Sequence, residues 1–339
     1  MQDAARKINP KLLGQLGVLM LLTLGVIVLD YRSLTGGVSL SKLEVVQSHH
    51  LPIKELSGLA FAKSTSGTDE FVAIGDRNAT LISLKLDPKG QATTESTDLS
   101  PLIVGSSSIC REGLVGPCKK INRRFSSDWE AVAIDAQGHL FLVQEFSSSV
   151  VVIDQSRTKV LARINLDFEQ SLTKGSKKRA ENADTLGEGI LLLKNGHIVI
   201  ARERYPASLV EFGPVGEAPM GISKDTVLGS GEVFKMDVLK KDYAPLHSWK
   251  RPLRSKCDIS DLAYNQKGKF FLLSDNCRRL EVFDSLGVDS VKIELKQGWI
   301  VPPIIKHPEA IAFDSSHRMM LGSDIKSRKP NLFVLDERK

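Results

Sequence analysis

A short pattern that returns five times along the chain constrains its fold more than any other feature of the sequence. Each copy starts with an acidic or hydroxyl residue, runs through apolar residues to a tight turn, and ends in a second apolar run followed by an acid. One such unit cannot bury its apolar face alone, so the repetition predicts an array of stacked units. The copies span residues 57–76, 129–145, 187–203, 259–275 and 308–324.

Each copy has the features of a β-hairpin. Gln137-Gly138, Asn195-Gly196 and Gly268 supply the turns of the second, third and fourth copies, and Asn-Gly tolerates the positive φ of a tight hairpin. The apolar runs are nearly continuous, which indicates strands buried on both faces. A third apolar segment follows each terminal acid. The sequence therefore predicts an all-β protein, a β-propeller with five countable blades.

Two segments leave details of the ring open. A sixth blade could lie in residues 231–249, where GEVFKMDV and PLHSW resemble strands without the hairpin pattern. We favour the alternative that they are outer strands of the third blade. The segment LEVVQ at residues 43–47 could close the ring by completing the last blade, which would remove a free sheet edge.

The first thirty residues predict a membrane anchor. Leu12 to Leu29 is an uncharged stretch of 18 residues, long enough for a transmembrane helix, and Arg6, Lys7 and Lys11 before it place the N-terminus in the cytoplasm. A cleaved signal peptide and a cytosolic protein with an apolar helix are the alternatives. The predicted division is a cytoplasmic basic tail (1–11), a signal anchor (12–29), a linker with the ring-closing strand (30–50) and a periplasmic or extracellular propeller (51–339).

The four cysteines fit an oxidising compartment. The simplest pairing is local, Cys110 with Cys118 and Cys257 with Cys277, since hairpin geometry would bring the last two to the same end. Other pairings and reduced core thiols stay open. A zinc site is a weaker alternative because the chain has no CxxC pair.

Acids recur at both ends of the hairpin pattern. The two ends of an antiparallel hairpin meet, so both columns should surround the mouth of the central channel. Carboxylates so crowded need protons or cations, and oxygen ligands suit Ca²⁺ best. The first column is Ser57, Glu130, Glu188, Ser260 and Glu309, and the second is Asp76, Glu145, Glu203, Asp275 and Asp324.

These positions suggest separate roles. We expect Glu130 and Glu188 to activate water, and a metal to be held by Asp76, Glu145, Glu203, Asp275, Glu309 and Asp324. Arg77, Arg202, Arg204 and His307 flank the acids and are candidates for binding substrate, although arginines can also pair structurally with such acids. His139 and His197 fall at the opposite hairpin turns, where we expect them to be solvated.

The strings SDWEAVAID, LGEGI, CDISDLAY and HPEAIAFD resemble blade motifs of the esterase-like phytase family and the related SdiA-regulated family. The resemblance covers nearly all of residues 56–336 and implies a β-propeller with an acid-lined, calcium-dependent site, with hydrolysis of phosphoesters or esters in some relatives. The matching residues are Glu130, Glu145, Glu188, Glu203, Asp275, Glu309 and Asp324. Serine replaces glutamate in the first and fourth copies.

Two classes of function follow. One is a membrane-anchored, metal-dependent hydrolase of a small phosphoester or ester, and the other is a non-catalytic propeller that binds a protein, a peptide or a cell-envelope polymer. The sequence lacks GxSxG, HExxH, Walker and EF-hand motifs. Nucleic acid is not an expected partner, because the net charge of +6 comes largely from basic loop segments without interleaved aromatic residues.

Overall fold

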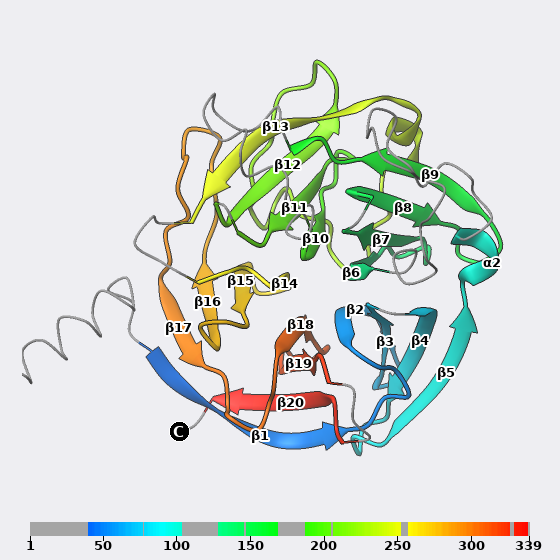
Figure 1. Ribbon diagram of the computed structural model, residues 1–339, viewed down its shortest axis with the longest axis vertical. Coiled ribbons are helices and arrows are strands. Elements are labelled where there is room, and N and C mark those ends of the chain that lie inside the picture. Colours follow the sequence, from blue (N-terminus) through cyan, green and yellow to red (C-terminus); the bar gives the residue numbers. More distant parts are fainter. Residues whose placement is uncertain are drawn as a thin grey trace, which may run out of the picture.

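A computed structural model describes residues 40–76, 78–103, 128–145, 147–168, 187–204, 206–251, 257–325 and 329–337. Within these ranges the chain forms five four-stranded blades around a central axis (Figure 1). Among them, no helix is long and apolar enough to cross a membrane. The predicted anchor at 12–29, together with Arg77, Cys110 and Cys118, lies outside the described residues.

Each blade is an antiparallel sheet whose first strand lies nearest the axis. The first blade contains β2 (Leu56–Thr65), β3 (Thr68–Gly75), β4 (Asn78–Leu86) and β5 (Ala92–Asp98), followed by the short helix α2 (Ser100–Ile103). The second contains β6 (Trp129–Ile134), β7 (Leu140–Gln144), β8 (Ser149–Ile153) and β9 (Val160–Asn165). The third contains β10 (Gly189–Leu192), β11 (Ile198–Arg202), β12 (Ser208–Pro214) and β13 (Tyr243–Lys250).

The last two blades share one continuous sheet. The fourth contains β14 (Asp261–Asn265), β15 (Lys269–Ser274), β16 (Arg279–Phe283) and β17 (Gln297–Ile300). The fifth contains β18 (Pro308–Phe313), β19 (Met319–Ser323) and β20 (Leu332–Glu337), and its outer strand is β1 (Leu40–His49). β1 pairs antiparallel with β20 and parallel with β17. The prediction that the segment at 43–47 closes the ring is confirmed.

The hairpin turns and the blade interfaces follow from the sequence pattern. Gly138, Gly196 and Gly268 adopt φ values of 85°, 94° and 86°, as tight turns require. Five apolar clusters lie between the blades, one at each contact of two neighbours, so that both faces of the central strands are buried. This packing explains the nearly continuous apolar runs.

The segment at 231–249 does not form a sixth blade. β13 pairs with β12 as the outer strand of the third blade, as favoured above. The expectation of a strand at GEVFKMDV is wrong, because these residues lead into a 3-10 helix, η5 (Met236–Lys240). Phe234 and Val238 are buried in the cluster between the second and third blades, and this packing accounts for their apolar character.

Candidate functional site: an acidic channel mouth

The first acidic column lies on β-bulges. In β2, β6 and β18 the strand register shifts at Ser57, Glu130 and Glu309, so that each of these residues is the extra one opposite the second strand. A bulge bends its strand and redirects the extra side chain. The predicted column is therefore built by a recurring backbone irregularity.

The third and fourth blades have an equivalent irregularity: two consecutive residues at the start of the first strand lie opposite one residue of the second strand. The N–H of Glu188 donates a hydrogen bond of 2.9 Å to the carbonyl of Ala201, which also faces Gly189. The backbone N–H of Ser260 donates a hydrogen bond of 2.9 Å to the carbonyl of Leu273, the residue that lies opposite Asp261. The five positions are thus equivalent in structure as well as in sequence.

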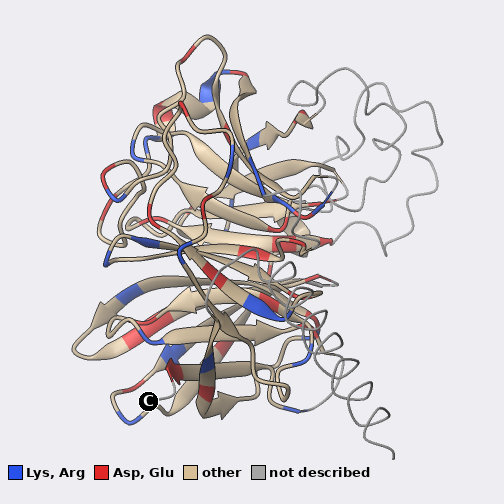
Figure 2. Ribbon diagram, turned by 90° about the vertical axis from the view of Figure 1, so that its left-hand side faces the viewer, with Lys and Arg blue, Asp and Glu red and all other residues tan. Residues whose placement is uncertain are grey.

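The second column is tied to the first by backbone hydrogen bonds. In three blades, the N–H of the acid after the second strand donates to the carbonyl of the residue two positions before the bulge. These bonds join Asp76 to Glu55, Glu145 to Asp128 and Asp324 to His307, over 3.0, 3.0 and 2.8 Å. The two hairpin ends meet on one side of the ring, and in Figure 2 many acidic segments lie near the middle of the disc.

Three glutamates of the first column interact across the mouth. Burial, and then the charges of Glu145, Asp76, Asp128 and Glu309, hold the pKa of Glu130 well above its usual value. Burial and the charges of Glu130, Glu145 and Glu309 do the same for the pKa of Glu188, which also shares a hydrogen bond with Glu145. The pKa of Glu309 is raised to about 9, first by burial and then by the charges of Asp324, Asp275, Asp76 and Asp258. Acids of all five blades therefore act on one another.

Asp76, Asp128 and Glu130 form a compact group of acids. One ligand atom from each lies within 4.8 Å of the other two. Asp128 was not among the predicted ligands, because it stands two residues before the bulge and belongs to neither column. The available signal was local: Asp128 precedes Trp129-Glu130 in the motif SDWEAVAID.

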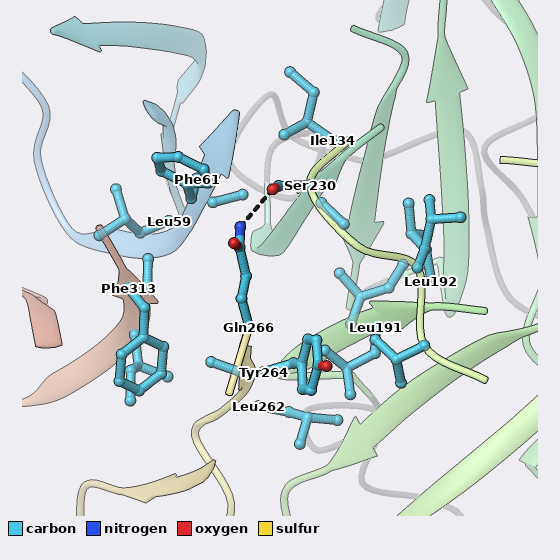
Figure 3. A pocket seen from close by; sticks show the side chains of 18 of the residues that line it. Leu59, Phe61, Ile134, Leu191, Leu192, Ser230, Leu262, Tyr264, Gln266 and Phe313 are labelled. Atoms are coloured by element: carbon cyan, nitrogen blue, oxygen red, sulfur yellow. Dashed lines mark hydrogen bonds between the residues drawn. The ribbon is translucent and has the colours of Figure 1, made fainter. Parts of the chain in front are cut away.

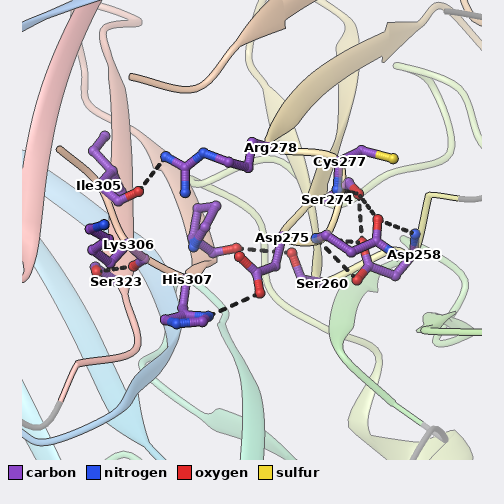
Figure 4. A network of polar contacts seen from close by, with 12 residues as sticks. Asp258, Ser260, Ser274, Asp275, Cys277, Arg278, Ile305, Lys306, His307 and Ser323 are labelled. Carbon is purple, nitrogen blue, oxygen red and sulfur yellow. Dashed lines mark hydrogen bonds and ion pairs between the residues drawn. The ribbon is translucent and has the colours of Figure 1, made fainter. Parts of the chain in front are cut away.

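A polar network with a disulfide forms the side of the mouth between the fourth and fifth blades (Figure 4). The predicted bond between Cys257 and Cys277 is present, with the two Cα atoms 5.3 Å apart. Ser274 Oγ donates a hydrogen bond of 2.5 Å to Asp258. His307 Nδ1 lies 3.2 Å from Asp275 Oδ2, which links the fourth blade to the fifth.

The remaining predicted residues have different surroundings. Glu203 forms an ion pair with its neighbour Arg204. Arg202 is 4% exposed and burial lowers its pKa; in the described part of the chain its Nε has no hydrogen-bond partner. His197 was expected to be solvated but is fully buried, with its ring nitrogens 2.7 Å from Glu211 and 3.1 Å from Glu217.

The other end of the channel has a mixed polar and apolar lining (Figure 3). A pocket there is lined by the inner strands of all five blades, with Phe61, Ile134, Tyr264 and Phe313 among its residues. Asp261 also lines it, but both of its oxygens accept backbone N–H bonds of 2.7 Å, from Leu262 and Ile311, and burial raises its pKa. The acids that raise one another's pKa therefore lie at the opposite end of the channel.

Comparison with known proteins agrees with this architecture. The family described as SdiA-regulated matches residues 118–335, which is more than half of the chain. The chain belongs to the SdiA-regulated family. The resemblance read from the blade motifs is confirmed for this family, and the match covers the second to fifth blades up to β20. No curated protein matches the sequence.

Several solved structures are similar to this member of the SdiA-regulated family. A streptogramin B lyase is 9% identical, with 87% of this chain and 97% of that chain covered and a TM-score of 0.39. Regucalcin from Agrobacterium tumefaciens, described as a calcium-binding protein, is 11% identical, with coverage of 87% and 93% and a TM-score of 0.42. The extracellular domain of a putative hybrid two component system from B. thetaiotaomicron is 12% identical with a TM-score of 0.35. This chain spans only 27% of that last protein's length.

Proposed function

We propose that the acidic mouth binds Ca²⁺ through Asp76, Asp128 and Glu130. Calcium–oxygen distances of about 2.3–2.6 Å allow two ligand oxygens on one ion to lie up to about 5 Å apart. The 4.8 Å limit within this group meets that requirement, and all donors in it are carboxylate oxygens. Glu145 and Glu309, whose charges act on Glu130, lie close enough to contribute to the field at the ion.

The observation that carries this proposal is the mutual repulsion of three half-buried glutamates. Glu130, Glu188 and Glu309 come from the second, third and fifth blades, and each has its pKa raised first by burial and then by neighbouring acids. A divalent cation would offset both causes, because it favours the ionised carboxylates and replaces their lost solvation. Calcium binding should therefore release protons from the mouth.

We infer that the chemistry of this site is hydrolysis of a small phosphoester. Bound calcium would polarise a phosphoryl oxygen and neutralise developing negative charge. Glu188 would accept a proton from the attacking water, because it is half-buried, shares a hydrogen bond with Glu145 and lies outside the group of Asp76, Asp128 and Glu130. Glu130, expected to activate water, is better suited to binding the metal.

The proposed setting is the outer side of a membrane. The uncharged stretch from Leu12 to Leu29 and the basic residues before it support a single-pass anchor with a cytoplasmic N-terminus. The disulfide between Cys257 and Cys277 supports a periplasmic or extracellular propeller, since such bonds persist in oxidising compartments.

The direct test is release of phosphate from p-nitrophenyl phosphate and other monoesters by the full chain, in calcium and in chelator. We expect turnover that requires calcium and falls at least about a hundredfold in Glu188→Gln, with calcium affinity retained. Glu95→Gln, an exposed acid on β5, is the matched control. Calcium binding without turnover of any ester would instead favour the non-catalytic propeller that binds a protein, a peptide or a polymer.

A further inference from the structure

A second cavity, of about 780 Å³, opens beside the acidic mouth on the fifth blade. It is within the size range of small-molecule sites. Asp324, an acid of the second column, and His307, which contacts Asp275, both line it. The cavity and the carboxylate ring therefore share Asp324, and a ligand in the cavity would lie at the edge of the ring on the fifth blade.

The charges of this cavity differ in sign from those of the mouth. Lys306 and Lys329 line it together with His307, and Asp324 is the one acid among its described lining residues. Lys306 and His307 are exposed, so the Lys306 ammonium and the His307 ring nitrogen that does not contact Asp275 can reach a ligand. Ammonium groups beside a carboxylate ring provide a place for an anion that the ring alone would repel.

Hydrogen bonds to backbone carbonyls fix the segment that carries Lys306 and His307 (Figure 4). Arg278 donates hydrogen bonds to the carbonyls of Pro302 and Ile305, at 2.9 and 2.6 Å, and Ser323 Oγ donates to the carbonyl of Lys306. His307 has a φ of 43°, a left-handed conformation that a non-glycine residue keeps only where its surroundings fix it. Such preorganisation reduces the entropy that a ligand would lose on binding.

Apart from Ser48, the other residues that line the cavity are apolar. Ile304 is 66% exposed on this wall, and Ile325 and the buried Phe333 lie among the other lining residues. A large exposed isoleucine in a cavity offers apolar surface that a ligand can remove from water. The cavity thus combines cationic groups with an apolar surface.

We propose that this cavity binds an anionic ester that carries an apolar group, namely an aryl or alkyl phosphate monoester. The phosphate lies toward Lys306, Lys329 and the channel mouth, and the apolar group lies on Ile304 and Phe333. This inference rests on the proposed function, because it names the substrate class of the same site. The cavity supplies its own positive charges, so binding does not depend wholly on calcium.

The test is calorimetric titration of the full chain with phenyl phosphate and with inorganic phosphate, in calcium and in chelator. We expect phenyl phosphate to bind at least about tenfold more tightly than phosphate. The double variant Lys306→Gln/Lys329→Gln should weaken phenyl phosphate at least about tenfold, while Lys89→Gln/Lys267→Gln, at exposed positions elsewhere, should not. Ile304→Ser should reduce the preference for phenyl phosphate and leave phosphate binding unchanged.

Equal affinity for the two ligands, or equal loss in both double-lysine variants, would overturn the cavity proposal. Calcium titrations of the same proteins separate this result from the proposed function. If phenyl phosphate binds in chelator as expected but calcium does not bind the wild type, the calcium site is wrong and the cavity stands. If calcium binds and phenyl phosphate does not, the cavity proposal is wrong and the calcium site stands.

Discussion

The hydroxyl of Ser260 in the fourth blade donates a hydrogen bond of 3.0 Å to the carbonyl oxygen of Pro308 in the fifth. Ser260 occupies the bulge position at which three other blades carry glutamate. Ser57, the remaining exception, donates at 3.0 Å to the carbonyl of Glu55. Both serines thus use the bulge to satisfy backbone groups. The two positions without a carboxylate therefore have a structural role, and the ring acids come from the other copies and from the second column.

Replacing Ser260 with alanine should lower stability without affecting calcium. The substitution leaves the Pro308 carbonyl without this donor, and we expect the free energy of unfolding to fall by about 1–2 kcal/mol. Denaturant titration in chelator measures this change. Ser290→Ala removes an exposed bond to the Lys292 carbonyl and should cost less. A large loss of calcium affinity in Ser260→Ala would show that the serine belongs to the metal site.

Asp128→Asn should weaken calcium binding at least about tenfold, because it removes one anionic ligand from the group with Asp76 and Glu130. Asp225→Asn, at an exposed position in another loop, is the control and should bind calcium like the wild type. Isothermal titration gives both affinities. Unchanged affinity in Asp128→Asn would exclude Asp128 as a ligand and move the ion elsewhere in the mouth.

The metal-free protein should lose stability as the pH rises. The pKa of Glu309 is about 9 in the folded protein and near 4.5 in the unfolded chain, so between these values the folded state holds a proton that the unfolded state has lost. Stability then decreases with pH across this window. The raised pKa values of Glu130 and Glu188 act in the same direction.

Melting temperatures in chelator between about pH 5.5 and about pH 8.5 measure this slope. Glu309→Gln should flatten it, and calcium should raise the melting temperature more at the upper end, where fewer protons compete. A metal-free protein whose stability rises steadily over this range would contradict the assignment of raised pKa values to the mouth.

Removing the disulfide should destabilise the fourth blade. Cys257 and Cys277 are separated by 20 residues, and a loop of this size corresponds to about 3 kcal/mol in the chain-entropy model. We expect Cys257→Ala/Cys277→Ala to unfold at lower denaturant, and reduction of the wild type to have a similar effect. No change on reduction would mean that this bond contributes nothing to the fold in solution.

The sequence was sufficient to predict the blades because their signals are local. Turn glycines such as Gly138 and Gly196 occur in four copies and the paired apolar runs in all five, and each hairpin forms between neighbours in sequence. The closing strand was predictable because the last copy is followed by too little chain for a fourth strand, so the fifth blade takes its outer strand from the segment before the first copy. The strand expected at residues 231–238 failed because burial of Phe234 and Val238 between blades gives apolar residues without a strand.

Only those residues of the site that occupy the same position in each copy of the repeat were predictable. Both acidic columns were found, but Asp128 was not, because its approach to Asp76 depends on contact between two blades. His197 was placed correctly at a turn and wrongly in solvent, since Glu211 and the distant Glu217 enclose it in the folded chain. Contacts between segments far apart in sequence leave no periodic signal.

The most direct measurement is calcium titration of the full chain by calorimetry near neutral pH, repeated in two buffers of different ionisation enthalpy. We predict binding of calcium with release of protons, and loss of both in Glu130→Gln, because the ion must displace protons from the half-buried carboxyls. Absence of calcium binding, or binding that releases no protons and is unchanged in Glu130→Gln, would contradict this prediction.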